Sequence, residues 1–172
     1  MKQTEYTACL LLGSNILPEH YLPSAVNLIQ KQLEILKTSS VWETSAIGSE
    51  GPNFLNAALL VATSFDALSL KEQILRPIEA QLGRVRTQDK NAARTIDIDI
   101  LIFNEQVLDR TLWDYAFRAV PAAEILPGVI SETGENLKDA AARLARMSQI
   151  SLRVDVVLTK FTKVKGWVTK GF

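Results

Sequence analysis

The sequence predicts an α+β sandwich, in which helices cover an antiparallel sheet. Three observations support this fold class: apolar runs rich in strand-forming residues, segments with apolar residues at helical spacing, and Gly or Pro residues between them. The length of 172 residues suits one domain. We expect that domain to span residues 1–172, with a core at residues 1–150 and a C-terminal extension at residues 151–172.

The N-terminal half contains three predicted strands and one helix. Residues 6–12 form an apolar run that stops at residues 13–15 (Gly-Ser-Asn), which is typical of a buried strand ending in a turn. A helix is predicted from Pro23 through Leu36, where apolar residues recur every three or four positions. Residues 38–44 and 54–63 are rich in strand formers, and we expect them to pair antiparallel.

The second half begins with a helix predicted over residues 70–82. We expect Pro77 to kink this helix, because proline cannot donate a backbone hydrogen bond and crowds the preceding turn. A strand over residues 94–103 completes the order β-α-β-β-α-β, which is the ferredoxin-like pattern. Further elements are predicted at residues 106–108 (strand), 121–127 (short helix), 135–147 (helix) and 152–158 (strand).

The composition excludes several classes of function. Lys+Arg and Asp+Glu balance at 19 each, so no overall field attracts nucleic acid or an anionic membrane. Cys9 is the single cysteine and is expected to be a buried core residue, as in a reducing compartment. The N-terminus has no apolar signal-peptide core, and no apolar run approaches membrane-spanning length. We expect a cytoplasmic protein, and the sequence carries no pattern that specifies an oligomeric state.

Two carboxylates, Asp97 and Asp99, interrupt the otherwise apolar strand at residues 94–103. Side chains alternate across a strand, so both point to the same side and repel each other unless a cation lies between them. Mg²⁺ favours such an oxygen-only ligand set, and a solvent-facing side of the strand is the alternative. Directly before this strand, residues 84–94 carry four basic residues and one acidic residue. A basic loop beside two carboxylates suits a metal-bound polyphosphate, although its arginines would also neutralise the aspartates in a solvated loop.

Five segments carry a resemblance to a known family: Leu12-Gly13-Ser14-Asn15, Phe54-Leu55-Asn56-Ala57-Ala58, Ile78-Glu79, Gly83-Arg84-Val85-Arg86 and Arg94-Thr95-Ile96-Asp97-Ile98-Asp99-Ile100. In this order and spacing they resemble the 6-hydroxymethyl-7,8-dihydropterin pyrophosphokinase family of folate biosynthesis. The resemblance covers about residues 6–127. Its most specific part is Arg-Thr-x-Asp-x-Asp after a basic loop.

The resemblance implies transfer of a diphosphoryl group from ATP to the hydroxymethyl group of the dihydropterin, which leaves AMP. It implies that Asp97 and Asp99 hold two Mg²⁺ ions, and that Arg84 and Arg94 act on the phosphate charge as catalytic residues. Phe54 and Phe117 would stack on the pterin ring, and Asn56 would read its polar edge. The remaining positions are Thr44 and Ile47 at the pterin edge, and Glu79, Arg86, Lys90 and Arg110 near the nucleotide.

The segment at residues 109–118 departs from the family pattern. It is shorter than usual, contains no histidine, and has Tyr115 where the family has an arginine. Arg110 and Arg118 are the two candidates to supply the missing charge. A catalytically weakened relative that binds a nucleotide or pterin without efficient turnover is therefore the alternative function. An RNA-binding module of ferredoxin-like fold is less well supported, because the sequence shows no exposed aromatic ladder and no net charge.

Overall fold

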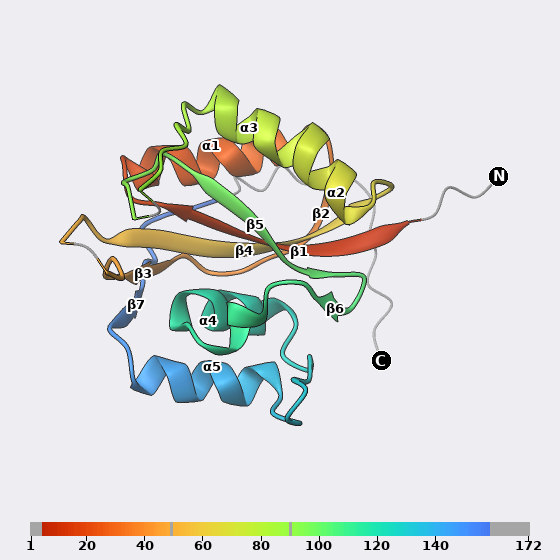
Figure 1. Ribbon diagram of the computed structural model, residues 1–172, viewed down its shortest axis with the longest axis vertical. Helices are drawn as coiled ribbons and strands as arrows, with labels where there is room; N and C mark the ends of the chain where they lie inside the picture. Colours follow the sequence, from red (N-terminus) through yellow and green to blue (C-terminus); the bar gives the residue numbers. More distant parts are fainter. Residues whose placement is uncertain (1–4, 49, 90, 159–172) are drawn as a thin grey trace.

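The computed structural model describes residues 5–48, 50–89 and 91–158. Their strands form one antiparallel sheet in the order β6-β5-β1-β4-β3-β7, and β2 pairs with β4 as well (Figure 1). The strands are β1 (Tyr6–Ser14), β2 (Glu34–Thr38), β3 (Trp42–Thr44), β4 (Phe54–Thr63), β5 (Asp97–Phe103), β6 (Gln106–Val107) and β7 (Ile150–Leu152). The predicted α+β sandwich with a ferredoxin-like order of elements is therefore confirmed.

Helices cover both faces of this sheet (Figure 1). One face carries α1 (Pro18–Gln30) and a long helical segment made of α2 (Ala67–Leu70), the π-helical η1 (Lys71–Leu75) and α3 (Arg76–Gln81). The other face carries the 3-10 helix η2 (Arg110–Trp113), then α4 (Ala116–Ile125), with α5 (Leu137–Arg146) packed outside it.

The central strand β1 separates two hydrophobic cores. Its side chains alternate, so Leu10 and Leu12 pack into the core under α1 and α3, while Cys9 and Leu11 pack into the core under α4. Burial raises the pKa of the Cys9 thiol to about 12, so Cys9 is an inert core residue. Both faces of β1 are covered, which explains why its sequence is continuously apolar.

Two helix predictions were wrong in their bounds. The helix expected through Leu36 ends at Gln30. Leu33 directly precedes β2 and Leu36 lies within it, because the long strand β4 offers this segment a pairing partner. The helix expected at residues 121–127 starts at Ala116 and contains Pro121. The strand expected at residues 152–158 is short, since β7 ends at Leu152.

The kink expected at Pro77 stays a prediction, and the structure shows that the helical segment changes type next to this residue. Pro77 lies in the first turn of α3, directly after the π-helical η1. Because proline has no backbone N–H to donate, Pro77 cannot make an α-helical bond inside this continuous segment, and the wider π turn lies directly before it.

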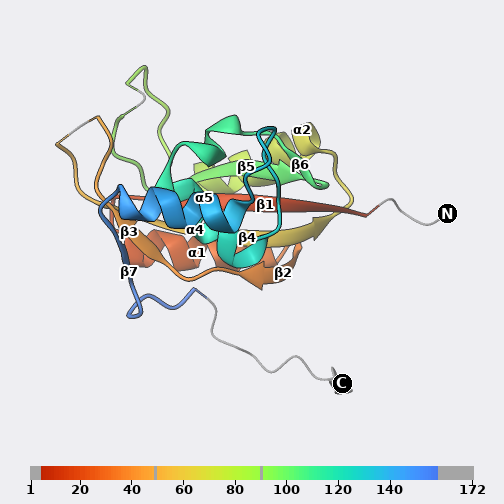
Figure 2. The same cartoon turned by 90° about the horizontal axis from the view of Figure 1, so that it is seen from below.

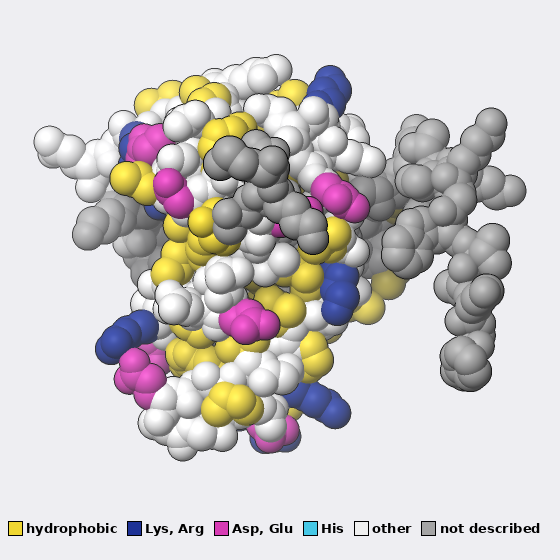
Figure 3. Space-filling model, turned by 90° about the vertical axis from the view of Figure 1, so that its right-hand side faces the viewer, with side chains coloured by type: hydrophobic (Ala, Val, Ile, Leu, Met, Phe, Trp, Pro, Cys, Tyr) yellow, Lys and Arg dark blue, Asp and Glu magenta, His cyan; other side chains and the backbone are white. Residues whose placement is uncertain are grey.

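No helix in the described part of the chain is long and apolar enough to cross a membrane. Figure 3 shows the end of the molecule where β1 begins, and there the acidic and basic side chains of the described residues are interspersed with apolar ones.

The packing predicts the effect of removing a core side chain. Leu59 on β4 is fully buried, so Leu59→Ala should lower the free energy of unfolding by about 2–5 kcal/mol, measured by urea denaturation. Leu68 is 70% exposed, and Leu68→Ala should change the same quantity by less than about 0.5 kcal/mol. Equal effects of the two substitutions would contradict this assignment of the core.

Candidate active site

A cavity of about 260 Å³ lies at the end of the sheet where β1 terminates. The connection after β3 and the connection before β5 project side by side at this end (Figures 1 and 2). The cavity is lined by Leu11, Gly13, Thr44, Ser45, Ile47, Phe54, Asn56, Asn91, Arg94, Asp97, Asp99, Tyr115, Phe117 and Arg118. Strands β5, β1 and β4 thus form its floor, and the start of α4 forms one wall.

Gly13 keeps the middle of the floor open. In the sheet register it lies between Asn56 of β4 and Asp97 of β5. A Cβ atom at this position would come within 3.1 Å of Asn56 Oδ1, closer than ordinary contacts allow. A side chain at residue 13 would therefore displace the Asn56 amide.

The carboxylates of Asp97 and Asp99 both face the cavity, as strand alternation predicts. Arg94 Nη1 lies 2.9 Å from Asp97 Oδ2, and Arg84 Nε lies 3.8 Å from Asp97 Oδ1. Arg118 Nη1 approaches Asp99 Oδ2 at 3.5 Å. Three guanidinium groups from separate parts of the chain therefore surround two like charges.

Two of these arginines are incompletely satisfied. Arg84 Nε and Arg118 Nε are buried and have no hydrogen-bond partner among the described residues. Arg118 Nη1 takes part only in ion pairs, to Asp99 and at 2.8 Å to Asp109 Oδ2. Buried donors without acceptors are rare in folded proteins, so these groups indicate a place where an anionic ligand can supply acceptors.

Burial and charge act against each other on Asp99. Burial, followed by repulsion from Asp97, raises the pKa of the Asp99 carboxyl above its ordinary value, and the nearby Arg118 guanidinium opposes that rise. A cation beside Asp99 would favour its ionised form in the same way as Arg118 does.

Glu79 supports the carboxylate strand from behind. It is almost fully buried, and its Oε1 accepts a hydrogen bond from the Ile98 backbone N at 2.8 Å. Its Oε2 pairs with Arg86 Nη2 at 2.6 Å. Burial raises the pKa of the Glu79 carboxyl, while the bonds from Ile98 and Arg86 lower it. Glu79 thus fixes the backbone between Asp97 and Asp99 without lining the cavity.

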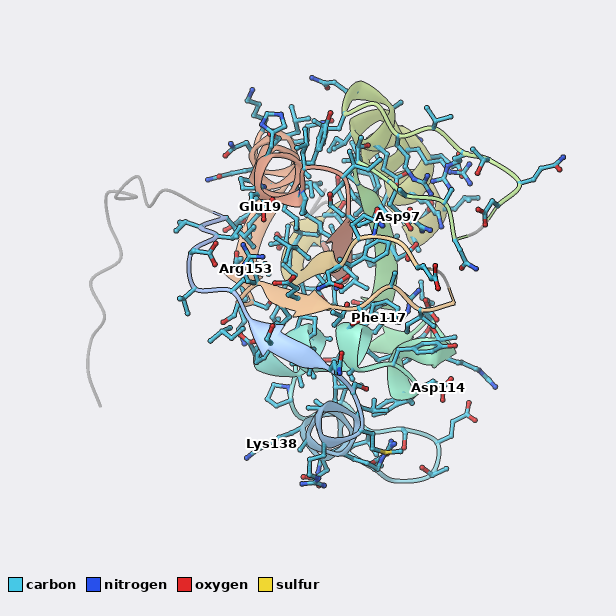
Figure 4. The ribbon with its side chains drawn as sticks, turned by 90° about the vertical axis from the view of Figure 1, so that its left-hand side faces the viewer. Glu19, Asp97, Asp114, Phe117, Lys138 and Arg153 are labelled. Carbon is cyan, nitrogen blue, oxygen red and sulfur yellow. The ribbon has the colours of Figure 1, made fainter. Side chains whose placement is uncertain are left out.

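An amide and two aromatic rings form the other half of the cavity. Asn56 Nδ2 donates to Thr44 Oγ1 at 3.0 Å, which fixes the orientation of the amide. Phe54 and Phe117 both line the cavity, and Figure 4 shows Phe117 and Asp97 on the same side of the molecule. The Arg94 guanidinium lies 5.5 Å from the Phe54 ring centroid, so the aromatic half and the charged half adjoin each other.

The structure brings most of the predicted site residues together. Eight of them line the cavity: Thr44, Ile47, Phe54, Asn56, Arg94, Asp97, Asp99 and Phe117. Three more predicted residues lie behind the cavity lining. Arg84 pairs with Asp97, Glu79 accepts a hydrogen bond from the Ile98 backbone N, and Arg86 pairs with Glu79. Arg110 is not brought to the cavity, because its highly exposed side chain pairs with Glu132 at 3.0 Å. Lys90 lies outside the described residues.

Sequence reasoning missed the structural part played by Asn15. Its Oδ1 accepts from the Arg94 backbone N at 2.7 Å, and its Nδ2 donates to the Pro52 carbonyl at 3.4 Å. One side chain thus ties together the two connections that flank the cavity. The signal was present as an asparagine after a glycine at the end of a strand, but the partners of Asn15 lie far away in sequence. The sequence also did not place Arg118 at the cavity, because it offered Arg118 only as one of two candidates to supply the missing positive charge.

Comparisons with known proteins agree with this geometry. Residues 9–127 match the family model described as 7,8-dihydro-6-hydroxymethylpterin-pyrophosphokinase (HPPK). The chain is 35% identical over 137 residues to a Bacillus subtilis 2-amino-4-hydroxy-6-hydroxymethyldihydropteridine pyrophosphokinase, covering 73% of this chain and 81% of the relative. The Aquifex aeolicus protein of the same name is 35% identical over 134 residues, covering 72% of this chain and 82% of the relative.

Solved structures show the same fold. The wild-type Plasmodium falciparum HPPK-DHPS with pteroate superposes with a TM-score of 0.66 at 14% identity, over 83% of this chain and 45% of that longer chain. The same protein with SDX-DHP gives a TM-score of 0.63 at 13% identity, over 81% of this chain and 44% of that chain. This chain therefore spans less than half of those proteins, and the likeness concerns the fold alone. With the family model matching more than half of its residues, the chain belongs to the 7,8-dihydro-6-hydroxymethylpterin-pyrophosphokinase family.

Proposed function

We propose that this protein transfers the terminal diphosphoryl group of ATP to the hydroxymethyl group of 6-hydroxymethyl-7,8-dihydropterin. In this reaction the pterin hydroxyl oxygen bonds to the β-phosphorus, the bond from that phosphorus to the α–β bridging oxygen breaks, AMP leaves, and the hydroxyl proton is released. One observation carries the proposal: a single cavity joins a carboxylate pair surrounded by arginines to two aromatic rings and an amide that Thr44 holds in one orientation. This activity is the one named for the curated relatives.

The carboxylate pair fits Mg²⁺. Asp97 and Asp99 lie two residues apart on β5 and both line the cavity, so they are the candidate ligands. Mg²⁺ is commonly held by one or two carboxylates, with water and substrate phosphate oxygens completing its shell. Two ions bound by Asp97 and Asp99 would neutralise phosphate charge and orient the polyphosphate.

Arginines provide the rest of the charge for the polyphosphate. Arg84, Arg94 and Arg118 lie around the carboxylate pair, and Arg84 Nε and Arg118 Nε have no hydrogen-bond partner among the described residues. Phosphoryl transfer depends mainly on positioning and charge neutralisation, so a separate catalytic base is not required. Glu79 and Arg86 would support the nucleotide side through β5, and Lys90 would add charge from the loop. Arg110 stays a prediction from the sequence.

The aromatic half of the cavity suits a flat heterocycle with a polar edge. Phe54 and Phe117 would stack on the pterin, and the Asn56 amide would donate to and accept from its ring edge. Thr44 holds Asn56 in one orientation, and Ile47 contributes from the connection after β3. The pterin hydroxymethyl group would then face the carboxylate pair, because the two halves share the same floor.

The direct test is product analysis. Purified protein with ATP, Mg²⁺ and 6-hydroxymethyl-7,8-dihydropterin should form AMP and pterin diphosphate in equal amounts, measured by chromatography. Asp97→Asn should lower the rate about 100-fold or more, because it removes half of the metal-binding charge. Glu132→Gln, at an exposed position away from the cavity, should leave the rate unchanged. Absence of AMP at high enzyme concentration would refute the activity, and ligand binding without AMP would favour the weakened relative.

The two arginine candidates predict different kinetics. Arg118→Ala should lower kcat/KM for ATP by about 100-fold, since one lost transition-state contact is worth about 2–4 kcal/mol. Arg110→Ala should have an effect at least about tenfold smaller, because its side chain lies on the surface with Glu132. Steady-state AMP formation at varied ATP concentration separates these outcomes. The reverse order would show that Arg110, not Arg118, supplies the phosphate contact.

The open floor predicts a selective loss of pterin binding. Gly13→Ala should raise the KM for the pterin about tenfold, because the new methyl group pushes against Asn56 Oδ1. Gly128→Ala is the matched control, since a Cβ there meets nothing within 4 Å. Measured KM values for the pterin and for ATP decide the matter. A larger rise in the KM for ATP than in the KM for the pterin would contradict the assignment of Asn56 to the pterin half of the cavity.

A further inference from the structure

Arg153 joins the C-terminal segment to the strand that borders the cavity. It directly follows β7, which pairs antiparallel with β3, and its backbone N donates to the Val41 carbonyl at 2.9 Å. Its side chain is only 24% exposed. This part of the chain lies beyond the residues matched by the family model.

The Arg153 guanidinium contacts three carboxylates from three elements. Nη1 donates to Glu43 Oε2 on β3 at 3.0 Å. Nε and Nη2 each donate to Asp155 at 2.8 Å, and Nη2 also lies 3.2 Å from Glu19 Oε1 on α1. The Arg153 guanidinium lowers the pKa of Asp155 to about 2. The hydrogen bond from Asn53, followed by the one from Arg153, lowers the pKa of Glu43 below its ordinary value, so both carboxyl groups stay ionised at neutral pH.

Glu43 links Arg153 to Asn53, the last residue of the connection after β3. While Oε2 accepts from Arg153, Oε1 accepts from Asn53 Nδ2 at 3.0 Å. Glu43 precedes the connection at residues 45–53, and Asn53 is its last residue before β4. Arg153 and Glu43 together therefore fix both ends of a loop that contributes Ser45 and Ile47 to the cavity.

The two faces of β3 connect this cluster to the site. Side chains alternate along the strand, so Glu43 points away from the cavity and Thr44 points into it. Thr44 in turn holds the Asn56 amide, which lies three residues after Asn53. Figure 4 shows Arg153 and Glu19 together, separated from Asp97 and Phe117. A displacement of β3 at Glu43 would therefore also displace Thr44 and the Asn56 amide that Thr44 holds.

We propose that Arg153 is a positioning residue for the pterin half of the active site, acting through Glu43 on β3 and on the connection at residues 45–53. The inference rests on the proposed function for the identity of the ligand. Strand β3 has only three residues and pairs with β4 on one side and with β7 on the other, so its position depends on both pairings and on this cluster. Loss of the cluster lowers the fraction of molecules in which Thr44 and Asn56 are aligned, and the apparent pterin affinity falls with that fraction.

The test compares Arg153→Gln and Arg153→Lys in the full chain. Calorimetry with Mg²⁺ and a non-hydrolysable ATP analogue measures nucleotide binding, and addition of 6-hydroxymethyl-7,8-dihydropterin then measures pterin binding. Arg153→Gln should weaken pterin binding about three- to tenfold and nucleotide binding less than about twofold. Arg153→Lys should lie between wild type and Gln, because lysine keeps the charge but has no planar fork to bridge two carboxylates.

A control and a second measurement separate positioning from stability. Arg76→Gln removes the more exposed Arg76–Glu72 pair, neither residue of which lines the cavity, and should leave both affinities unchanged. Backbone hydrogen exchange in the ligand-free protein should become faster at residues 43–56 in Arg153→Gln and not in Arg76→Gln. Unchanged pterin affinity in Arg153→Gln, or equal weakening of both ligands, overturns the inference.

The same data distinguish failure of the inference from failure of the proposed function. If wild-type protein does not bind the pterin, the proposed function fails. Hydrogen exchange then decides the role of Arg153: faster exchange at residues 43–56 supports positioning of this wall, and unchanged exchange overturns it.

Discussion

The repulsion between Asp97 and Asp99 is the constraint on which the site depends. Two carboxylates on one strand face, partly removed from water, require positive charge close by. Arg84 and Arg94 come from the connection after α3, and Arg118 comes from α4 on the opposite layer. The carboxylate pair therefore brings positive charge from segments far apart in the sequence to one end of the sheet.

This arrangement explains how the site can be stable without ligand and still receive one. The ion pairs to Asp97 and Asp99 limit the cost of burying the carboxylates, yet Arg84 Nε and Arg118 Nε keep buried donors without described partners. Under the proposed function, the aspartates bind cations and the arginines bind phosphate oxygens. These new ion pairs replace the ion pairs between the arginines and the aspartates. Little charge is then left uncompensated at any stage, which favours binding of metal and polyphosphate together.

Local sequence patterns predicted β1, β4, β5 and the shared face of Asp97 and Asp99, because strand alternation is a local property. They did not predict contacts set by the register of distant strands. Gly13 faces Asn56 and Asp97 only because β1 lies between β4 and β5, and Glu43 meets Arg153 across 110 positions. Periodicity also failed at Leu36, where pairing with β4 outweighed helical spacing.

The departure at Tyr115 is compatible with an intact phosphate site. Tyr115 caps the N-terminus of α4 at the position where the family resemblance expects an arginine, and Arg118 lies three residues later. Residues three apart in a helix share one face, so both side chains reach the same cavity. The guanidinium of Arg118 contacts Asp99 and lies 5.1 Å from the Phe117 ring centroid, at the junction of the charged and aromatic halves. Arg118 therefore places positive charge at this junction about one helical turn after Tyr115, so the absence of an arginine at residue 115 does not leave the junction without a guanidinium.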